Sequence, residues 1–382
     1  MSAQPVPPAA APEPPLVRVS EGREVLAYVP HALGFTPETS LVAVSLRPPR
    51  GRIGLVARVD LDDLTGPQGR SVAHGLARHL DDDGAAGLFV VVYVPGSLAR
   101  ARHLAAVRRA VDALEAAADV PVRDAFVVAQ DGYASLRCRD ERCCPARGRP
   151  LSDLTATQIG AAMIMAGSAP VARREDLRIG VSQDAAARAA FDRAVRAERV
   201  RRVRARGTAR EPGWRRDRAR TCLEVLDAGT GPDRGPSPEE LGRLSEALSD
   251  LLLRDLVVAA VLTGHRPDLS GASTTHRVRD DLEEAVGRMF DPGGPPPDRD
   301  RTDAARAVVA AAARLASDRP RARLLGVLAW ISWWCGDGAQ AQVMTRDALA
   351  LDDSERLALL TSAALERGVA PAWVGGRPQP RR

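Results

Sequence analysis

Hydrophobic positions between residues 40 and 137 follow two periods that alternate along the chain. Val and Leu dominate Ser40–Arg47 and Arg52–Leu61, and the Pro-Pro-Arg-Gly turn between these stretches predicts a β-hairpin. Gly87–Val94 is a continuous apolar run bounded by Gly and Pro, as expected of a strand covered on both faces. Helix-like spacing follows these stretches, and Asp131-Gly132 predicts a second hairpin turn. The pattern predicts an α/β domain with a mixed sheet, placed at residues 19–150.

Strand-like patterns stop after Pro150, and segments rich in Ala, Leu and Arg take over between Pro- and Gly-rich breaks. We therefore expect an all-α domain at residues 151–370, and its longest segment could be two helices broken near Asp250. The expected helices are Thr155–Ala166, Gln183–Arg206, Arg215–Asp227, Pro238–Leu262, Thr275–Met289, Thr302–Ala316, Ala322–Cys335, Ala339–Leu351 and Ser354–Arg367.

The end of this helical region has the small-residue spacing of one tetratricopeptide-like hairpin. The residues that fit are Leu328, Ala329, Gly336, Ala341, Ala348 and Leu349. About three such units are normally needed to bury a shared core, so one unit is better explained as the last hairpin of a helical bundle. Three tryptophans on this segment, Trp330, Trp333 and Trp334, are expected to pack in the core, with a partner-facing patch as the alternative.

The two ends of the chain differ from the middle. Residues 1–18 are rich in Pro and Ala and predict a disordered lead-in, and residues 371–382 predict a flexible tail. No secretory signal is recognisable and no apolar run is long enough to span a membrane, so a cytoplasmic location without membrane contact is expected.

Composition excludes several enzyme classes. All 54 basic residues of the 382-residue chain are arginine, so a Walker-type phosphate loop, a pyridoxal Schiff base and a kinase strand lysine are excluded. HExxH and GxSxG are also absent from the sequence. No cofactor is indicated, and whether the protein is an enzyme stays open at this point.

Three segments resemble a known family. "YVPHALGFTPETSLVAVSLR" with "GRIGLVARVDL", the central "RDAFVVAQDGYASLRCRDERCCPARGRPL", and "LAWISWWCGDGAQAQVMTRDALALDDSERLALLTSAALERGVAP" are similar to segments of the actinobacterial domain-of-unknown-function family 4192. The family's central segment also carries a double Cys before a Pro. The resemblance implies a shared fold and lineage, and it implies no activity.

Three of the five cysteines, Cys138, Cys143 and Cys144, fall in one short run with the spacing C-x4-C-C. Zinc sites usually draw four ligands from two pairs, and no second pair is recognisable, so no metal ligand is assigned. A redox or disulfide role would join Cys138 to one of the other two thiols. The alternative is that all three are structural thiols of a turn at the domain junction.

Arg58 and Asp60 are two residues apart on a predicted strand and therefore share a face. The pair could grip an anionic or metal-bound ligand at the end of the sheet, or it could be a structural ion pair. Asp60 and Asp124 could also help to hold Mg²⁺ if their strand ends meet.

The segment from Arg188 to Arg220 holds 13 arginines and four acidic residues, a surplus of nine, although the whole chain nets only +5. Such a stripe could bind nucleic acid without sequence preference, but the aromatic residues that stack on single strands are nearly absent. A solvated basic helix is the alternative.

These observations favour a non-catalytic protein-binding, scaffolding or regulatory protein with a protein partner. An enzyme or small-molecule sensor, nucleotide- or metal-dependent, with a pocket around Arg58 and Asp60 is the second hypothesis. Nucleic-acid binding through the arginine-rich helix is the third.

Overall fold

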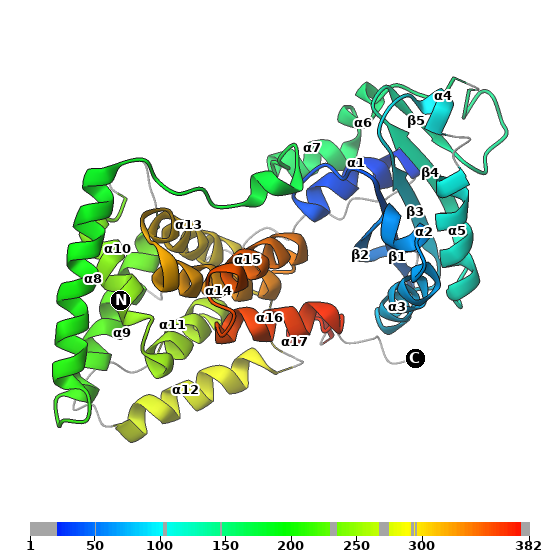
Figure 1. The fold of residues 1–382 in the computed structure, drawn as a ribbon. Coiled ribbons are helices and arrows are strands. Elements are labelled where there is room, and N and C mark those ends of the chain that lie inside the picture. The colour runs from blue at the N-terminus through cyan, green and yellow to red at the C-terminus, as the bar shows by residue number, and fades with distance from the viewer. Residues whose placement is uncertain are drawn as a thin grey trace, which may run out of the picture. The chain divides into compact units, whose positions relative to one another are not determined.

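The fold is described from a computed structural model that covers residues 21–49, 51–101, 105–145, 147–229, 235–266, 275–291, 294 and 296–375. The predicted lead-in and most of the predicted tail lie outside these residues. The chain forms two compact units, Met1–Pro170 and Val171–Arg382 (Figure 1). None of the described helices combines the length and the apolar character needed to cross a bilayer.

The first unit is built on a five-stranded mixed sheet with the order β2-β1-β3-β4-β5. Only β3 and β4 pair in parallel, and the other neighbours are antiparallel, which confirms the predicted mixed sheet and both hairpins. The strands are β1 (Ser40–Arg47), β2 (Arg52–Asp60), β3 (Leu88–Tyr93), β4 (Val122–Ala129) and β5 (Gly132–Ser135).

Helices cover both faces of this sheet. Alternate residues of β3 explain the arrangement, because Val90 and Val92 belong to the core beneath α3 and α5, whereas Val91 faces the other side. On that other side α1 approaches so closely that a side chain at Gly22 would meet the ring of Phe126. The helices are α1 (Gly22–Leu33), α2 (Leu61–Thr65), α3 (Gly69–Asp82), α4 (Leu98–Ala101), α5 (Ala105–Ala117), α6 (Ser152–Thr155) and α7 (Gln158–Met165).

Two short helices after Pro150, α6 and α7, pack against α1 in the first unit. The buried carboxylate of Glu24 accepts hydrogen bonds from the backbone N–H groups of Gln158 (3.3 Å) and Ile159 (3.0 Å), at the positive N-terminus of α7. The compact units divide after Pro170, and the domain boundary at residue 150 stays a prediction.

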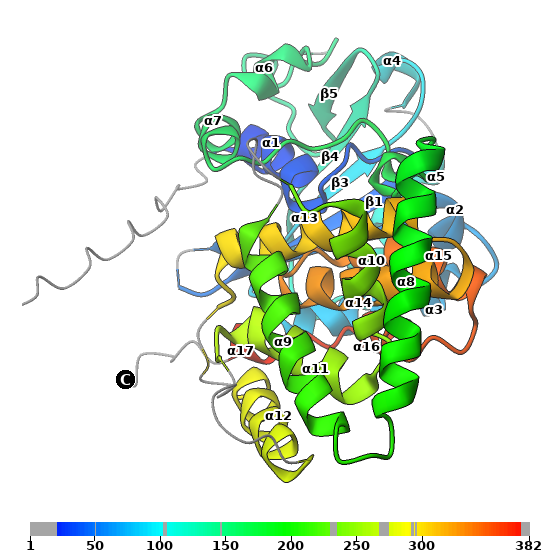
Figure 2. The same ribbon diagram turned by 90° about the vertical axis from the view of Figure 1, so that its left-hand side faces the viewer.

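All the named elements in the described part of the second unit are helices (Figure 2). The predicted break near Asp250 is present, since Asp250 caps α11 by accepting a hydrogen bond from the Leu253 N–H at 3.1 Å. The elements are η1 (Arg174–Leu177), α8 (Ala185–Ala205), α9 (Glu211–Ala228), α10 (Pro238–Ala247), α11 (Leu251–Thr263), α12 (Thr275–Met289), α13 (Arg299–Leu315), α14 (Asp318–Trp334), α15 (Gly338–Leu351), α16 (Arg356–Glu366) and α17 (Ala372–Gly375).

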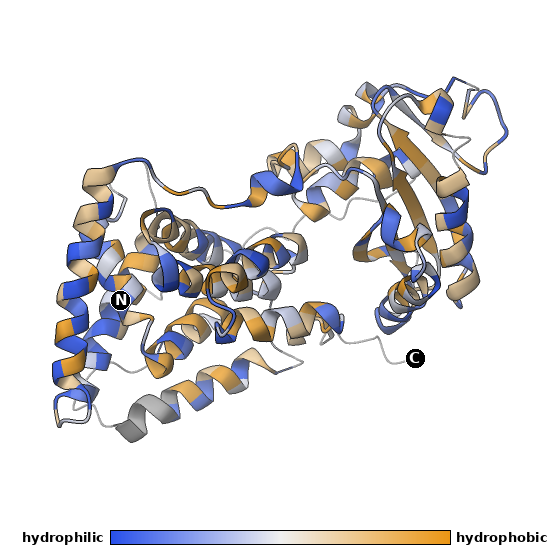
Figure 3. Cartoon of the chain, viewed as in Figure 1, coloured by the Kyte–Doolittle hydropathy of each residue, from blue (hydrophilic) through white to orange (hydrophobic). Residues whose placement is uncertain are grey.

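The core of the second unit centres on α14, whose buried apolar residues fall on all sides of the helix. Figure 3 shows that the helices of this unit mix hydrophilic and hydrophobic residues along their length. Trp330, Trp333 and Trp334 are buried there as expected, and the Trp333 indole donates a hydrogen bond to the Val369 carbonyl at 3.0 Å. α14 and α15 form the expected helical hairpin, joined through Gly336 at a φ of +87°. Its tetratricopeptide character stays a prediction.

Candidate functional site

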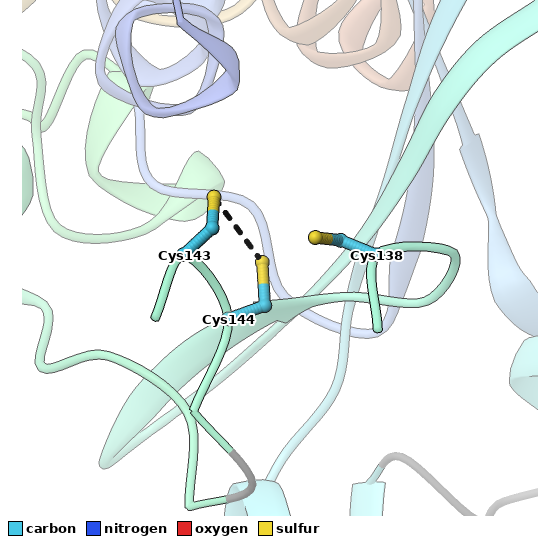
Figure 4. A group of neighbouring side chains, drawn as sticks. All are labelled: Cys138, Cys143 and Cys144. Carbon is cyan, nitrogen blue, oxygen red and sulfur yellow. Dashed lines mark hydrogen bonds between the residues drawn. The ribbon is translucent and has the colours of Figure 1, made fainter. Parts of the chain in front are cut away.

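The loop after β5 brings the three clustered cysteines together. The sulfur atoms of Cys138, Cys143 and Cys144 all lie within 4.8 Å of one another, and Cys143 Sγ and Cys144 Sγ are 3.9 Å apart. All three are free thiols, and Cys143 is exposed while the other two are half-buried. Figure 4 shows the Cys138 side chain pointing toward the adjacent pair. We call these residues the thiol site.

Local hydrogen bonds shape the first arm of this loop. The buried hydroxyl of Ser135 accepts hydrogen bonds from the backbone N–H groups of Arg137 (3.1 Å) and Cys138 (2.9 Å), and it donates to the Asp124 carboxylate at 2.9 Å. A serine that bonds backbone groups two and three residues ahead makes a tight turn directly after a strand. This turn directs the Cys138 side chain toward Cys143 and Cys144.

The second arm is a turn built on Asp140. Its carbonyl accepts hydrogen bonds from the N–H groups of Cys143 (3.1 Å) and Cys144 (2.7 Å). The Arg149 guanidinium donates from Nε to the Cys143 carbonyl at 2.7 Å, and the Arg149 backbone pairs with Tyr133 as an isolated β-bridge. The adjacent cysteines are therefore held by the turn at Asp140 on one side and by the Arg149 side chain on the other.

Electrostatics at the thiol site favour the protonated thiol. Burial, together with hydrogen bonds to the Cys138 and Cys143 thiols, raises the pKa of the Cys144 thiol to about 12, although a backbone hydrogen bond at Ser135 acts in the opposite direction. Because the thiolate is the nucleophile, a raised pKa opposes spontaneous redox chemistry at Cys144.

Tyr133 lies next to the thiol site and has no obvious signal in the sequence. Its side chain is 4% exposed, and its hydroxyl has no hydrogen-bond partner among the described residues. Burial raises the pKa of Tyr133, the Asp153 carboxylate raises it further, and Cys144 adds to the same effect.

Arg58 and Asp60, the predicted binding pair, contact each other at 2.5 Å on the edge strand β2. Arg58 Nε also donates to the buried Ser40 hydroxyl at 2.9 Å, and its guanidinium lies 5.8 Å from the centre of the Phe35 ring. Arg58 therefore forms an ion pair within the edge strand β2 and a hydrogen bond from β2 to Ser40 on β1. Asp124 is not brought near, because β1 and β3 lie between its strand and β2.

The arginine-rich segment forms most of α8 and the first half of α9, and carboxylates within and outside the segment neutralise part of its charge. The carboxylate of Glu246 is 1% exposed and pairs with Arg199 (3.3 Å) and Arg202 (2.9 Å). Glu198, fully buried, pairs with Arg201 and accepts a hydrogen bond from the Trp214 indole at 2.9 Å. Ion pairs to acidic residues are made by Arg199, Arg201, Arg202, Arg215, Arg216 and Arg218.

A groove of about 560 Å³ lies in the first unit where α2 and α3 face α5. Charged and polar side chains from both sides line it, namely Arg70, His74, Arg109 and Asp112, and all four are exposed. The groove is separate from the predicted Arg58 and Asp60 pocket, and neither residue lines it.

An apolar strip on α16 is exposed in the second unit. Leu359 and Leu360 are 46% and 54% exposed. Two exposed arginines flank them, Arg356 before the leucines and Arg367 after them. The opposite face of α16 is buried against α14 and α15, so the helix is fixed while this side faces outward. We call these four residues the α16 surface. Adjacent leucines between arginines were its signal in the sequence.

Comparison with known proteins gives one family and no relative. A family model described as "Domain of unknown function (DUF4192)" matches residues 23–272, about two thirds of the chain and parts of both units. No curated protein and no solved structure matches the chain.

Proposed function

Because this chain belongs to the family described as a domain of unknown function, DUF4192, whose description carries no activity, we propose a function from its own surfaces. The protein is a non-catalytic protein-binding protein with a scaffolding or regulatory role, and it acts in the cytoplasm. The α16 surface is the observation that carries this proposal.

The partner is recognised by apolar contact with a charged border. Large aliphatic side chains gathered on one fixed helix face and rimmed by charge are typical of protein interaction sites. Arg356 and Arg367 give the rim positive charge, so the partner segment presents apolar residues flanked by Asp or Glu.

Affinity capture with the full chain tests this function. A stoichiometric partner should be recovered from a native lysate of the source cells, and L359S together with L360S should abolish its recovery. Val203→Ser on α8 is the matched control, because Val203 is exposed but lies on another helix. Repeated failure to recover a stoichiometric partner, or equal recovery by the double variant, contradicts the proposal.

The groove between α3 and α5 supports a second candidate, a small-molecule sensor. Its volume lies in the range of ligand pockets, and two arginines against one carboxylate favour an anionic ligand such as a nucleotide. A nucleotide panel should raise the melting temperature of the wild type and not of R70A/R109A, while Arg108→Ala retains the shift. No shift with any nucleotide removes this candidate.

Nucleic-acid binding through α8 and α9 is the third candidate. Exposed arginines of α8, such as Arg193 and Arg196, are available to contact phosphates. Electrophoretic shift of non-specific DNA at low salt is the test, and absence of binding there ends the hypothesis.

A further inference from the structure

The spacing of the three sulfurs is that of ligands around one ion. A zinc–thiolate bond of about 2.3 Å in tetrahedral geometry puts two sulfurs about 3.8 Å apart. Cys143 Sγ and Cys144 Sγ are 3.9 Å apart, and Cys138 completes a group within 4.8 Å. A disulfide needs about 2.05 Å between its sulfurs. The sulfurs are therefore placed as neighbouring ligands and not as a bonded pair.

We propose that Cys138, Cys143 and Cys144 bind one thiophilic metal ion, zinc(II) in the first place, as three thiolates. Thiolates select zinc(II) and similar soft ions over magnesium and calcium. No His, Asp, Glu or further Cys among the described residues joins these three sulfurs, so water or an external ligand takes the fourth position. The site is independent of the α16 surface and of the partner proposed there.

The binding step balances through proton release. Three thiols and one divalent aqua ion give a tris-thiolate complex of net charge −1, with three protons passing to solvent. Each of the three thiols, that of Cys144 included, gives up its proton when the metal binds. The nearby Arg149 guanidinium, which donates to the Cys143 carbonyl, offsets the negative charge.

Tyr133 gains a hydrogen-bond partner in the metal-bound state. Its buried hydroxyl lacks a partner among the described residues, and a buried hydroxyl without one costs about 1–3 kcal/mol. The water in the fourth position supplies the missing acceptor, because none of the described sulfur atoms accepts a hydrogen bond from this hydroxyl. Tyr133 is therefore a positioning residue that stabilises the bound form.

Cobalt(II) titration of the reduced, metal-free full chain tests the site. One ion per chain should bind with thiolate-to-cobalt charge-transfer absorption and the intense visible bands of a tetrahedral complex, and zinc(II) should displace it. In weakly buffered solution, about three protons should appear for each ion bound. A weak octahedral spectrum, or binding without proton release, overturns the proposal.

Serine variants locate the ligands. Each of C138S, C143S and C144S should weaken binding by more than about 100-fold, beyond the 10–100-fold typical of outer-shell partners. Cys335→Ser is the matched control, because Cys335 lies at the end of α14 and should leave affinity unchanged. Wild-type affinity in all three variants would overturn the proposed site. Cys143 is exposed, so C143S should keep the fold. If C144S does not fold, the affinity of C143S for the metal tests the site.

Tyr133→Phe tests the positioning role. It should keep one ion per chain and weaken binding about tenfold, in the range of outer-shell partners. A change in melting temperature alone, with affinity unchanged, removes the role of Tyr133.

Discussion

The thiol site and the arginines of α8 and α9 are two regions in which one residue type is concentrated. The fold gives these two groups of side chains different neighbours. The arginines meet buried carboxylates, chiefly that of Glu198 on α8 itself and that of Glu246 on α10. The three cysteine sulfurs lie next to one another, beside a buried Tyr133 hydroxyl that has no hydrogen-bond partner among the described residues. Concentration of a residue type therefore says less about function than whether the fold brings partners to it.

The first prediction concerns the reactivity of the unpartnered region and has the largest effect. With a pKa near 12 against an ordinary 9.0, Cys144 should react with iodoacetamide at pH 8 on the order of a thousandfold more slowly than in the unfolded chain. The rate should rise about tenfold per pH unit toward pH 11. Peptide mass spectrometry at timed intervals measures it.

The sign for stability follows from the same shift. Since the folded-state pKa is raised, the contribution of Cys144 to stability is complete below pH 9 and is lost as the pH rises toward 12. Rapid labelling of Cys144 in the folded chain at pH 8 would contradict the raised pKa of this thiol.

The second prediction breaks the partnered region. Glu246→Ala removes the buried carboxylate between Arg199 and Arg202 and should lower the free energy of unfolding by about 3 kcal/mol, as for other buried pairs that lose one member. Denaturant unfolding monitored by circular dichroism measures the loss. Glu239→Ala, an exposed site on the same helix, should change stability little. Equal losses in the two variants would show that the network contributes nothing specific.

The third prediction sharpens the comparison by removing one donor. Trp214→Phe deletes the indole N–H that Glu198 accepts at 2.9 Å and should cost about 2 kcal/mol, because the acceptor is charged and buried. Trp373→Phe is the control, since the Trp373 indole donates to a neutral carbonyl, that of Trp334, at 2.9 Å and should cost about 1 kcal/mol. A larger loss in the control would reverse the ranking.

The fourth prediction has the smallest effect. Asp60→Asn breaks the pair with Arg58 on the sheet edge, where the Asp60 side chain is 48% exposed. The change should alter the free energy of unfolding by less than about 1 kcal/mol, because water screens exposed pairs. A melting-temperature difference measured by differential scanning calorimetry checks this. A loss comparable to that of Glu246→Ala would mean that the edge pair belongs with the buried networks.

The sequence predicted the parts of the fold that depend on local periodicity. Alternating and continuous apolar runs located the five strands of the sheet. Asp250 marked the point where α10 ends and α11 begins. The packing of α7 onto α1 could not be seen locally, because it depends on Glu24, more than a hundred residues earlier.

The candidate sites show the same limit. Charge counting over residues 188–220 omitted Glu246 and Asp250, which reach the arginines only after the helices fold together. The three cysteines were found from their spacing, but their convergence depends on the turns made by Ser135 and Asp140. A count of ligands along the chain therefore assigned no metal, although the folded loop gathers three sulfurs.

The backbone bridge between Tyr133 and Arg149 has a consequence for the energetics of the loop that carries the cysteines. The two hydrogen bonds of this bridge close a loop of about fifteen residues, so the entropy cost of closure is met when the sheet forms. An arriving ligand then has no chain to order. Binding should proceed nearly as fast as encounter allows, and release should leave the loop in place.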